Sequence, residues 1–112
     1  MKTTNIYDAP AKQNPHGVDV RPLYNTEHAV ISHLTLRPGE ALKTHVTPVD
    51  AVFYILEGRG VVEIGEERKE VTKDTLVDSP KGIPHRLMNE SDVDFRFLVL
   101  KLPRPEGSSK LL

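Results

Sequence analysis

The chain has no cysteine, no long apolar run and no block of charge of one sign. Without cysteine, neither a disulfide framework nor a thiolate metal site is available. Apolar stretches such as residues 52–56 are far shorter than the ~20 residues that cross a bilayer, and the N-terminal residues lack the apolar segment of a secretory signal. The 15 basic and 16 acidic residues are spread along the chain and nearly cancel. We therefore expect a cytoplasmic protein with no nucleic-acid or membrane partner.

Prolines and glycines divide the chain into short segments that are rich in β-branched and aromatic residues. There are nine prolines and seven glycines in 112 residues, and no window shows apolar residues at helical spacing. Strands are predicted over residues 30–36, 52–56, 61–64, 68–72, 75–77 and 95–102. Many short strands separated by turns indicate an all-β domain, either a sandwich or a barrel.

Three regions follow from the distribution of these strands. Residues 30–102 contain them and form the predicted β-barrel. Residues 1–29 are read as an N-terminal arm that a dimer could exchange, and residues 103–112 as a tail whose terminal leucines are able to dock. The length fits one domain with a single core.

Two histidine-bearing segments carry the chemistry that can be read from the chain. In the first, Gly39 is followed after five residues by His45, and in the second the sequence Pro80-Lys81-Gly82-Ile83-Pro84 leads to His85. Histidine is the commonest protein metal ligand, and separate strands of a closed barrel can bring two distant imidazoles together. Side chains alternate along a strand, so Thr47 is expected on the same face as His45.

These segments resemble the two motifs of the cupin superfamily of small jelly-roll barrels. The second motif, Gly-(five)-Pro-x-Gly-x-x-His-(three)-Asn, is matched at its last four typed positions, Pro80, Gly82, His85 and Asn89, with Asp74 in place of the leading glycine. The resemblance extends over roughly residues 30 to 100 and implies an all-β, jelly-roll (double-stranded β-helix) fold. In that fold we expect Pro80 and Gly82 to form a turn and Asn89 to make structural hydrogen bonds.

The first motif, Gly-(five)-His-x-His-(three or four)-Glu-(six)-Gly, is only partly matched. Gly39, His45 and Gly58 agree, whereas Thr47 stands for the second histidine and Ala51 for the glutamate. In the family, three histidines and one glutamate commonly hold Fe, Mn, Ni, Zn or Cu. Carried over to this chain, only the first-motif histidine and His85 remain.

Two interpretations of His45 and His85 stay open. They either form a hydrogen-bonded pair in a metal-free pocket, or they hold one divalent transition metal (Zn, Ni, Fe, Mn or Cu) loosely. A metal there would lack a carboxylate counter-charge, which is unfavourable in an apolar barrel. The nearest carboxylate, Asp50, has the wrong parity to replace Ala51 unless a bulge turns it inward.

The remaining candidate residues are assigned by strand parity. The residues expected to line a ligand pocket are Lys43, Thr47, Ala51, Phe53, Ile55, Phe97 and Val99. For the apolar members the alternative is that they fill the core. His33 is expected on the outer face at a subunit contact, and His16 and His28 at the surface.

These features together predict a barrel that binds a small polar or anionic organic molecule near its two histidines. Two alternatives remain, a metal-dependent cupin enzyme (an isomerase, a decarboxylase or a dioxygenase-like enzyme) and a non-catalytic metabolite sensor. The fold hosts many chemistries, so it does not choose among them. Outward apolar strands also predict a homodimer.

Overall fold

A computed structural model describes residues 1–107 and 110–112. These residues form β-strands and no helix, and so contain no helix long and apolar enough to cross a membrane. The strands are β1 (Asp19–Asn25), β2 (Val30–Leu36), β3 (His45–Val46), β4 (Asp50–Glu57), β5 (Arg59–Ile64), β6 (Glu67–Thr72), β7 (Leu76–Ser79), β8 (His85–Met88), β9 (Phe95–Leu102) and β10 (Lys110–Leu111).

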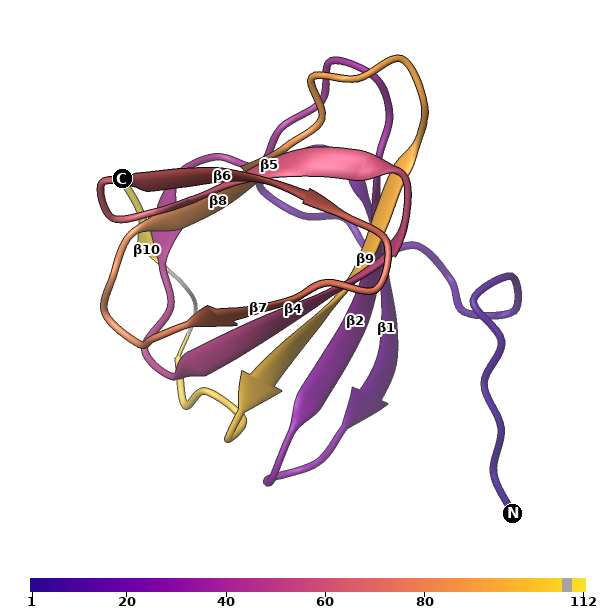
Figure 1. Ribbon diagram of the computed structural model, residues 1–112. Coiled ribbons are helices and arrows are strands. Elements are labelled where there is room, and N and C mark those ends of the chain that lie inside the picture. Colours follow the sequence, from indigo (N-terminus) through magenta and orange to yellow (C-terminus); the bar gives the residue numbers. More distant parts are fainter. Residues whose placement is uncertain (108–109) are drawn as a thin grey trace.

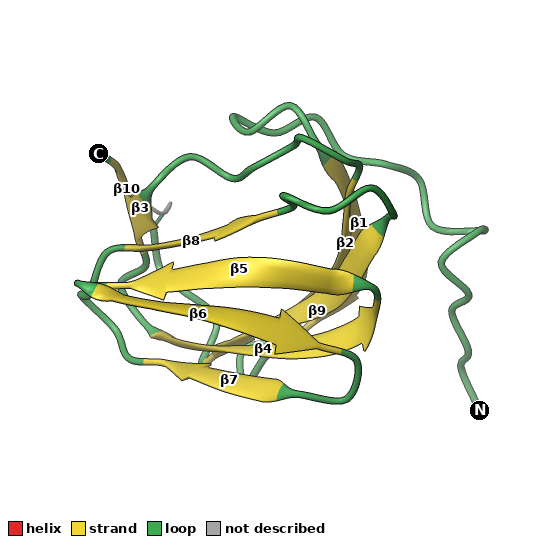
Figure 2. Cartoon of the chain, turned by 45° about the horizontal axis from the view of Figure 1, so that its top comes forward, coloured by secondary structure: helices red, strands yellow, loops and turns green. Residues whose placement is uncertain are grey.

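The strands form two antiparallel sheets that face each other and close into a barrel (Figures 1 and 2). The strand order is β1-β2-β9-β4-β7 in one sheet and β10-β3-β8-β5-β6 in the other. Strands adjacent in the sheets are mostly distant in the sequence, as in a double-stranded β-helix. The all-β jelly-roll prediction is confirmed.

The inner face changes character along β9, which lies between β2 and β4. Its inward positions are Phe95, Phe97, Val99 and Lys101, because side chains alternate across the sheet. The two phenylalanines are fully buried in the apolar core, whereas Lys101 lines a cavity. One end of the barrel is therefore filled with aromatic side chains, and the other end contains a cavity with Lys101 on its wall.

The cross-strand partners follow the same gradient. Phe97 pairs with Leu34 on β2 and Ile55 on β4, all three of them core residues. Four residues further along β9, Lys101 pairs with Val30 and Ala51. Register thus places Lys101 and the smaller side chains of β2 and β4 together at one end of the barrel.

Both termini contribute strands. β1 falls within the region predicted as an arm and pairs with β2 of the same chain. It is an edge strand, where a proline such as Pro22 is tolerated, and its register shifts between Pro22 and Tyr24. Interrupted alternation and this proline hid the strand in the sequence. At the other end, β10 pairs with β3, with Leu111 opposite His45.

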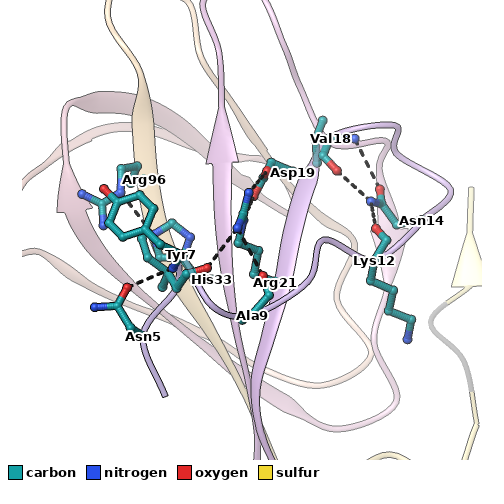
Figure 3. A network of polar contacts seen from close by, with 11 residues as sticks. Asn5, Tyr7, Ala9, Lys12, Asn14, Val18, Asp19, Arg21, His33 and Arg96 are labelled. Atoms are coloured by element: carbon teal, nitrogen blue, oxygen red, sulfur yellow. Dashed lines mark hydrogen bonds and ion pairs between the residues drawn. The ribbon is translucent and has the colours of Figure 1, made fainter. Parts of the chain in front are cut away.

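The N-terminal residues pack on the outer face of the sheet that contains β1 and β2. Figure 3 shows Arg21 between the Asp19 carboxylate and the backbone carbonyl of Ala9, to which its Nη1 donates over 3.2 Å. A second bond from Nη1 reaches the carbonyl of Ile6 at 3.0 Å. One guanidinium therefore holds this segment against β1.

His33 lies on the same outer face, as its parity predicted, but it is buried rather than available, with 2% of its surface exposed. Arg96 Nε donates to its Nε2 over 3.1 Å, so the neutral ring carries its proton on Nδ1, an atom without a hydrogen-bond partner among the described residues. Burial, and next the charge of Arg96, lower the pKa of His33.

This environment predicts that His33 makes the protein less stable in mild acid. In the unfolded chain His33 takes up a proton near pH 6.5, whereas the folded protein takes it up only at lower pH. The free energy of unfolding should therefore decrease as the pH falls from about 7 to 5, at up to ~1.4 kcal/mol per pH unit for one proton. His33→Gln should reduce the slope of this dependence in urea unfolding without abolishing it, because burial also lowers the pKa values of His16, His45 and His85. The same substitution at His28, whose side chain is 85% exposed, should change the slope less. Identical pH profiles for wild type and His33→Gln would contradict the prediction.

Candidate functional site

The end of the barrel away from Phe95 and Phe97 contains a cavity of about 430 Å³. Its wall is mainly apolar, with contributions from both sheets, from the segment at residues 12–16 and from the C-terminal part of the chain. The residues that matter most for its chemistry are Lys12, His16, Ser32, His45, Thr47, Ala51, Phe53, His85, Val99 and Lys101. A concave, mostly apolar site with a few converging polar groups is typical of small-molecule binding.

The two motif histidines meet at this cavity. His45 on β3 pairs directly with His85 on β8, and their Nε2 atoms lie 3.0 Å apart. The rings are 4.4 Å apart between centroids and nearly perpendicular, at 76°. Both residues are buried, although 40 positions separate them in the sequence.

Local turn geometry fixes where His85 enters its strand. Gly82 has φ +77°, a left-handed conformation that favours glycine, and its N–H donates to the carbonyl of Thr47 over 3.0 Å. Asp50, proposed above as a residue that a bulge could turn inward, is exposed instead and accepts from the N–H of Lys81 at 2.9 Å. The turn between β7 and β8 is thus tied to the segment that follows β3.

Asn89, at the end of the second motif, makes the structural hydrogen bonds predicted for it. Its Nδ2 donates to the carbonyls of Leu36 and Val93, at 2.8 and 2.7 Å, and its Oδ1 accepts from Ser91. These bonds connect the end of β8 to β2 and to the loop before β9.

Hydrogen bonds determine the tautomers of the two neutral rings. Nδ1 of His45 lies 2.8 Å from the Lys43 carbonyl, which only accepts, so this nitrogen carries the proton and Nε2 is an acceptor. Nε2–H of His85 must then donate to Nε2 of His45, which leaves Nδ1 of His85 to accept from the Ser79 hydroxyl at 2.6 Å. Thr47 Oγ1 lies 3.2 Å from Nε2 of His85.

The pair is uncharged at neutral pH. Burial is the largest cause that lowers the pKa of His85 to about 4, followed by the proximity of His45 and of Lys101. Burial likewise lowers the pKa of His45, although the bond to the Lys43 carbonyl opposes this. A desolvated imidazole favours its neutral form because the interior does not solvate a cation well.

A third histidine joins the pair from outside both motifs. His16 was expected at the surface, but it is half-buried on the cavity wall, and its ring centroid lies 5.0 Å from that of His45. Its Nδ1 accepts from the backbone N–H of Lys43 over 2.9 Å. Burial and then His45 lower the pKa of His16 to about 4.

Four of the seven predicted pocket residues lie on the cavity wall, namely Thr47, Ala51, Phe53 and Val99. The other three lie elsewhere. Ile55 and Phe97 are fully buried in the core, because their row of the sheet lies toward the aromatic end. Lys43 is exposed, because it precedes the two-residue strand β3, and only its backbone reaches the histidines.

Sequence reasoning missed Lys101 and His16 on the cavity wall, and also Ser79, which is buried and hydrogen-bonded to His85. Lys101 shares the inward parity of Phe97 and Val99, so continuing the alternation to the end of that strand would have found it. Ser79 could have been inferred in the same way from β7. His16 had no comparable signal, since its position depends on how a loop packs against a distant segment.

The donor set fits a metal ion only in part. Imidazole nitrogens bound at about 2.0–2.1 Å at right angles would be about 2.9 Å apart, close to the observed 3.0 Å between His45 and His85. The neighbouring positions are occupied by the neutral side chains of Thr47 and Ala51. Across the described part of the chain, no group of three or more His, Cys, Asp or Glu side chains could hold a metal ion. The residues present thus offer two ligand positions and no carboxylate.

Comparison with known proteins places this geometry in a family. Residues 32–101 match the sequence model of the cupin domain. The tetracenomycin polyketide synthase protein TcmJ of Streptomyces glaucescens is 34% identical over 80 residues, which cover 68% of this chain and 54% of that protein. The uncharacterized protein MJ1618 of Methanocaldococcus jannaschii is 34% identical over 62 residues, covering 55% of this chain and 49% of that protein. The chain spans about half the length of these two relatives.

Solved structures show the same architecture. TT1209 from Thermus thermophilus superposes with a TM-score of 0.80 at 34% identity, over 94% of this chain and 100% of that one. The polyketide cyclase RemF from Streptomyces resistomycificus superposes with a TM-score of 0.86 at 20% identity, over 100% of this chain and 85% of that one, a likeness of fold alone. With the family match spanning most of the barrel, the chain belongs to the cupin family.

Proposed function

We propose that this cupin binds a small organic molecule in its barrel cavity, in contact with His45 and His85. The observation that carries the proposal is a cavity of about 430 Å³ that reaches both imidazoles and is otherwise mainly apolar. The names of its relatives support a carbonyl or carboxylate compound as the ligand class. They include a polyketide synthase protein, a polyketide cyclase and, at 19% identity, a predicted oxalate decarboxylase from Thermotoga maritima.

The neutral histidine pair could also support acid–base chemistry on such a ligand. Its tautomers are set by Ser79 at one end and by the Lys43 carbonyl at the other, so a proton added at one ring requires rearrangement along the chain of hydrogen bonds. A neutral imidazole that touches a bound molecule can act as a general base. A non-catalytic sensor would use the same contacts to recognise its ligand without breaking a bond.

Binding can be tested with two aromatic probes of the same shape, 2-naphthoate and 2-naphthamide. At least one should bind the wild-type protein and perturb the NMR signals of both histidine rings. Val99→Phe fills the cavity and should weaken that binding at least about tenfold, equivalent to ~1.4 kcal/mol. Leu100→Phe, the next residue on β9 with its side chain on the opposite face, should change it less than about twofold. If neither probe shows binding sensitive to Val99→Phe, the proposal is wrong.

A metal-dependent cupin enzyme is the second candidate, favoured by the 3.0 Å spacing of the two Nε2 atoms. Protein purified without chelator or affinity tag should then contain about one equivalent of metal, which His45→Ala or His85→Ala removes. Metal well below one equivalent, unchanged by these substitutions, would exclude this candidate.

The missing ligands can also be restored. Thr47→His combined with Ala51→Glu places a third imidazole and a carboxylate beside the existing pair, and should raise the affinity for Zn²⁺ or Ni²⁺ at least about tenfold in calorimetry. The matched control is Val46→His with Val52→Glu, one position along each segment, where side chains face away from the cavity. Equal affinities for the two double variants would show that Thr47 and Ala51 do not occupy ligand positions.

We further propose that the protein is a cytoplasmic homodimer. The outer face of the β1-β2-β9-β4-β7 sheet carries a row of apolar side chains in register, Ile31, Leu100 and Val52, all partly exposed. Covering such a row with a second copy would remove apolar surface from water. Light scattering at micromolar concentration should give twice the 12.6 kDa chain mass, and a monomeric mass would contradict the proposal.

A further inference from the structure

Resting on the proposed function, we propose that the molecule bound in the barrel is an organic anion. Its negative charge pairs with Lys101, and its apolar body lies against Phe53 and Val99. Three observations carry this inference: where the register places Lys101, which charges surround the cavity, and how little of the cavity wall is polar.

The sheet directs Lys101 into the barrel. It occupies an inward position of β9, two residues beyond Val99 and four beyond the buried Phe97. Its neighbours across the sheet are Val30 on β2 and Ala51 on β4, which have small or medium apolar side chains. A long amine chain between short neighbours projects into the space that they leave, and Lys101 lines the cavity.

The charge around this cavity has one sign. Lys12 and Lys101 line it, its three histidines are neutral, and none of its described lining residues is an aspartate or a glutamate. The chain as a whole has 16 acidic residues against 15 basic ones, so this separation is not a result of composition. A low-dielectric cavity with cationic groups on its wall attracts anions and opposes a divalent cation.

The Lys101 ammonium lies where charge interactions are weakly screened. Burial, and next the charge of Lys12, lower the pKa of Lys101. After burial, the charge of Lys101 is among the causes that lower the pKa values of His45 and His85, so it is felt across the whole site. A bound anion would add a favourable Coulomb interaction in this environment and favour the charged form of the lysine.

The rest of the wall selects an organic anion over an inorganic one. Most of the surface that lines the cavity is apolar, and Val20, Leu34, Leu42, Phe53 and Val99 contribute to it. A small hydrated ion such as phosphate would leave this apolar surface uncovered, whereas a carboxylate or enolate on a hydrocarbon body would cover it. The inferred ligand is therefore a molecule with one anionic end and an apolar remainder.

The experiment compares the isosteric probes 2-naphthoate and 2-naphthamide, which differ in charge but hardly in shape. By calorimetry at pH 7, the wild-type protein should bind the carboxylate about 10- to 100-fold more tightly than the amide, the range expected for a hydrogen bond to a charged group. Lys101→Met keeps the length of the side chain but removes its charge, and should abolish this preference by weakening only naphthoate binding. Lys101→Arg keeps the charge and should retain most of the preference.

Lys43→Met is the matched control, because Lys43 is exposed and absent from the cavity wall. It should leave both affinities within about twofold of wild type. Inorganic phosphate at the same concentration should compete poorly with naphthoate.

The outcomes separate this inference from the function on which it rests. Binding of both probes with equal affinity, sensitive to Val99→Phe, would overturn the anion assignment while leaving a ligand-binding cavity in place. A naphthoate preference that survives Lys101→Met, or that disappears in Lys43→Met, would show that Lys101 is not the anion-binding residue. If neither probe binds in the cavity, both proposals are wrong.

Discussion

The pairing of β9 with β2 on one side and β4 on the other is the constraint on which the rest of the structure depends. This ladder turns four alternate residues of β9 into the barrel, two phenylalanines first, then Val99 and Lys101. Because the neighbouring strands are in register, Phe97 lies in a row with Leu34 and Ile55, whereas Lys101 lies in a row with the smaller Val30 and Ala51. The aromatic rows close one end of the barrel, and the rows of small side chains leave the space in which a ligand can lie.

The second sheet supplies the polar groups that face this space. The β3–β8 pairing is short, with a single pair of residues in register, His45 and His85. Such a short strand needs other supports, and the structure provides them in the tail strand β10 and in the bond from Gly82 to the Thr47 carbonyl. The position of the imidazoles thus depends on hydrogen bonds made by backbone groups on both sides of the pair.

Loss of two family ligands changes the electrostatics of the site rather than only its composition. A glutamate at position 51 would have balanced a cation, whereas alanine leaves the neighbouring Lys101 as a positive charge in the same row. With both motif histidines held neutral by burial, the net charge of the wall comes from lysine. Where other cupins commonly hold a metal ion, this barrel therefore has lysine charge on its wall, and the proposed anion site rests on that difference.

Much of the architecture was readable from local pattern. Alternation and turn residues predicted six strands and an all-β barrel, and the spacing from Pro80 to Asn89 identified the family. Four observed strands were not among these six. β1 contains a proline and a register shift, whereas β3, β8 and β10 have only two to four residues, too few for alternation to be visible. Ile55 and Phe97 fill the core instead of lining the cavity because of their position along the barrel. Strand parity predicts which face of the sheet a residue occupies, but not how far along the barrel it lies.

The sequence by itself determined the fold class and the identity of the two motif histidines, because alternation and motif spacing are local properties of the chain. Only the tertiary structure decided that His16 joins them, whereas alternation along the last long strand already directs Lys101 inward and register places it at the same cavity. The tertiary structure also decided that the two rings meet through their Nε2 atoms. These relations join segments separated by 27 to 40 or more residues, and they depend on sheet register and loop packing. Sheet register and loop packing leave no local pattern in the sequence, because both depend on how segments distant in the chain bury their apolar surfaces against each other.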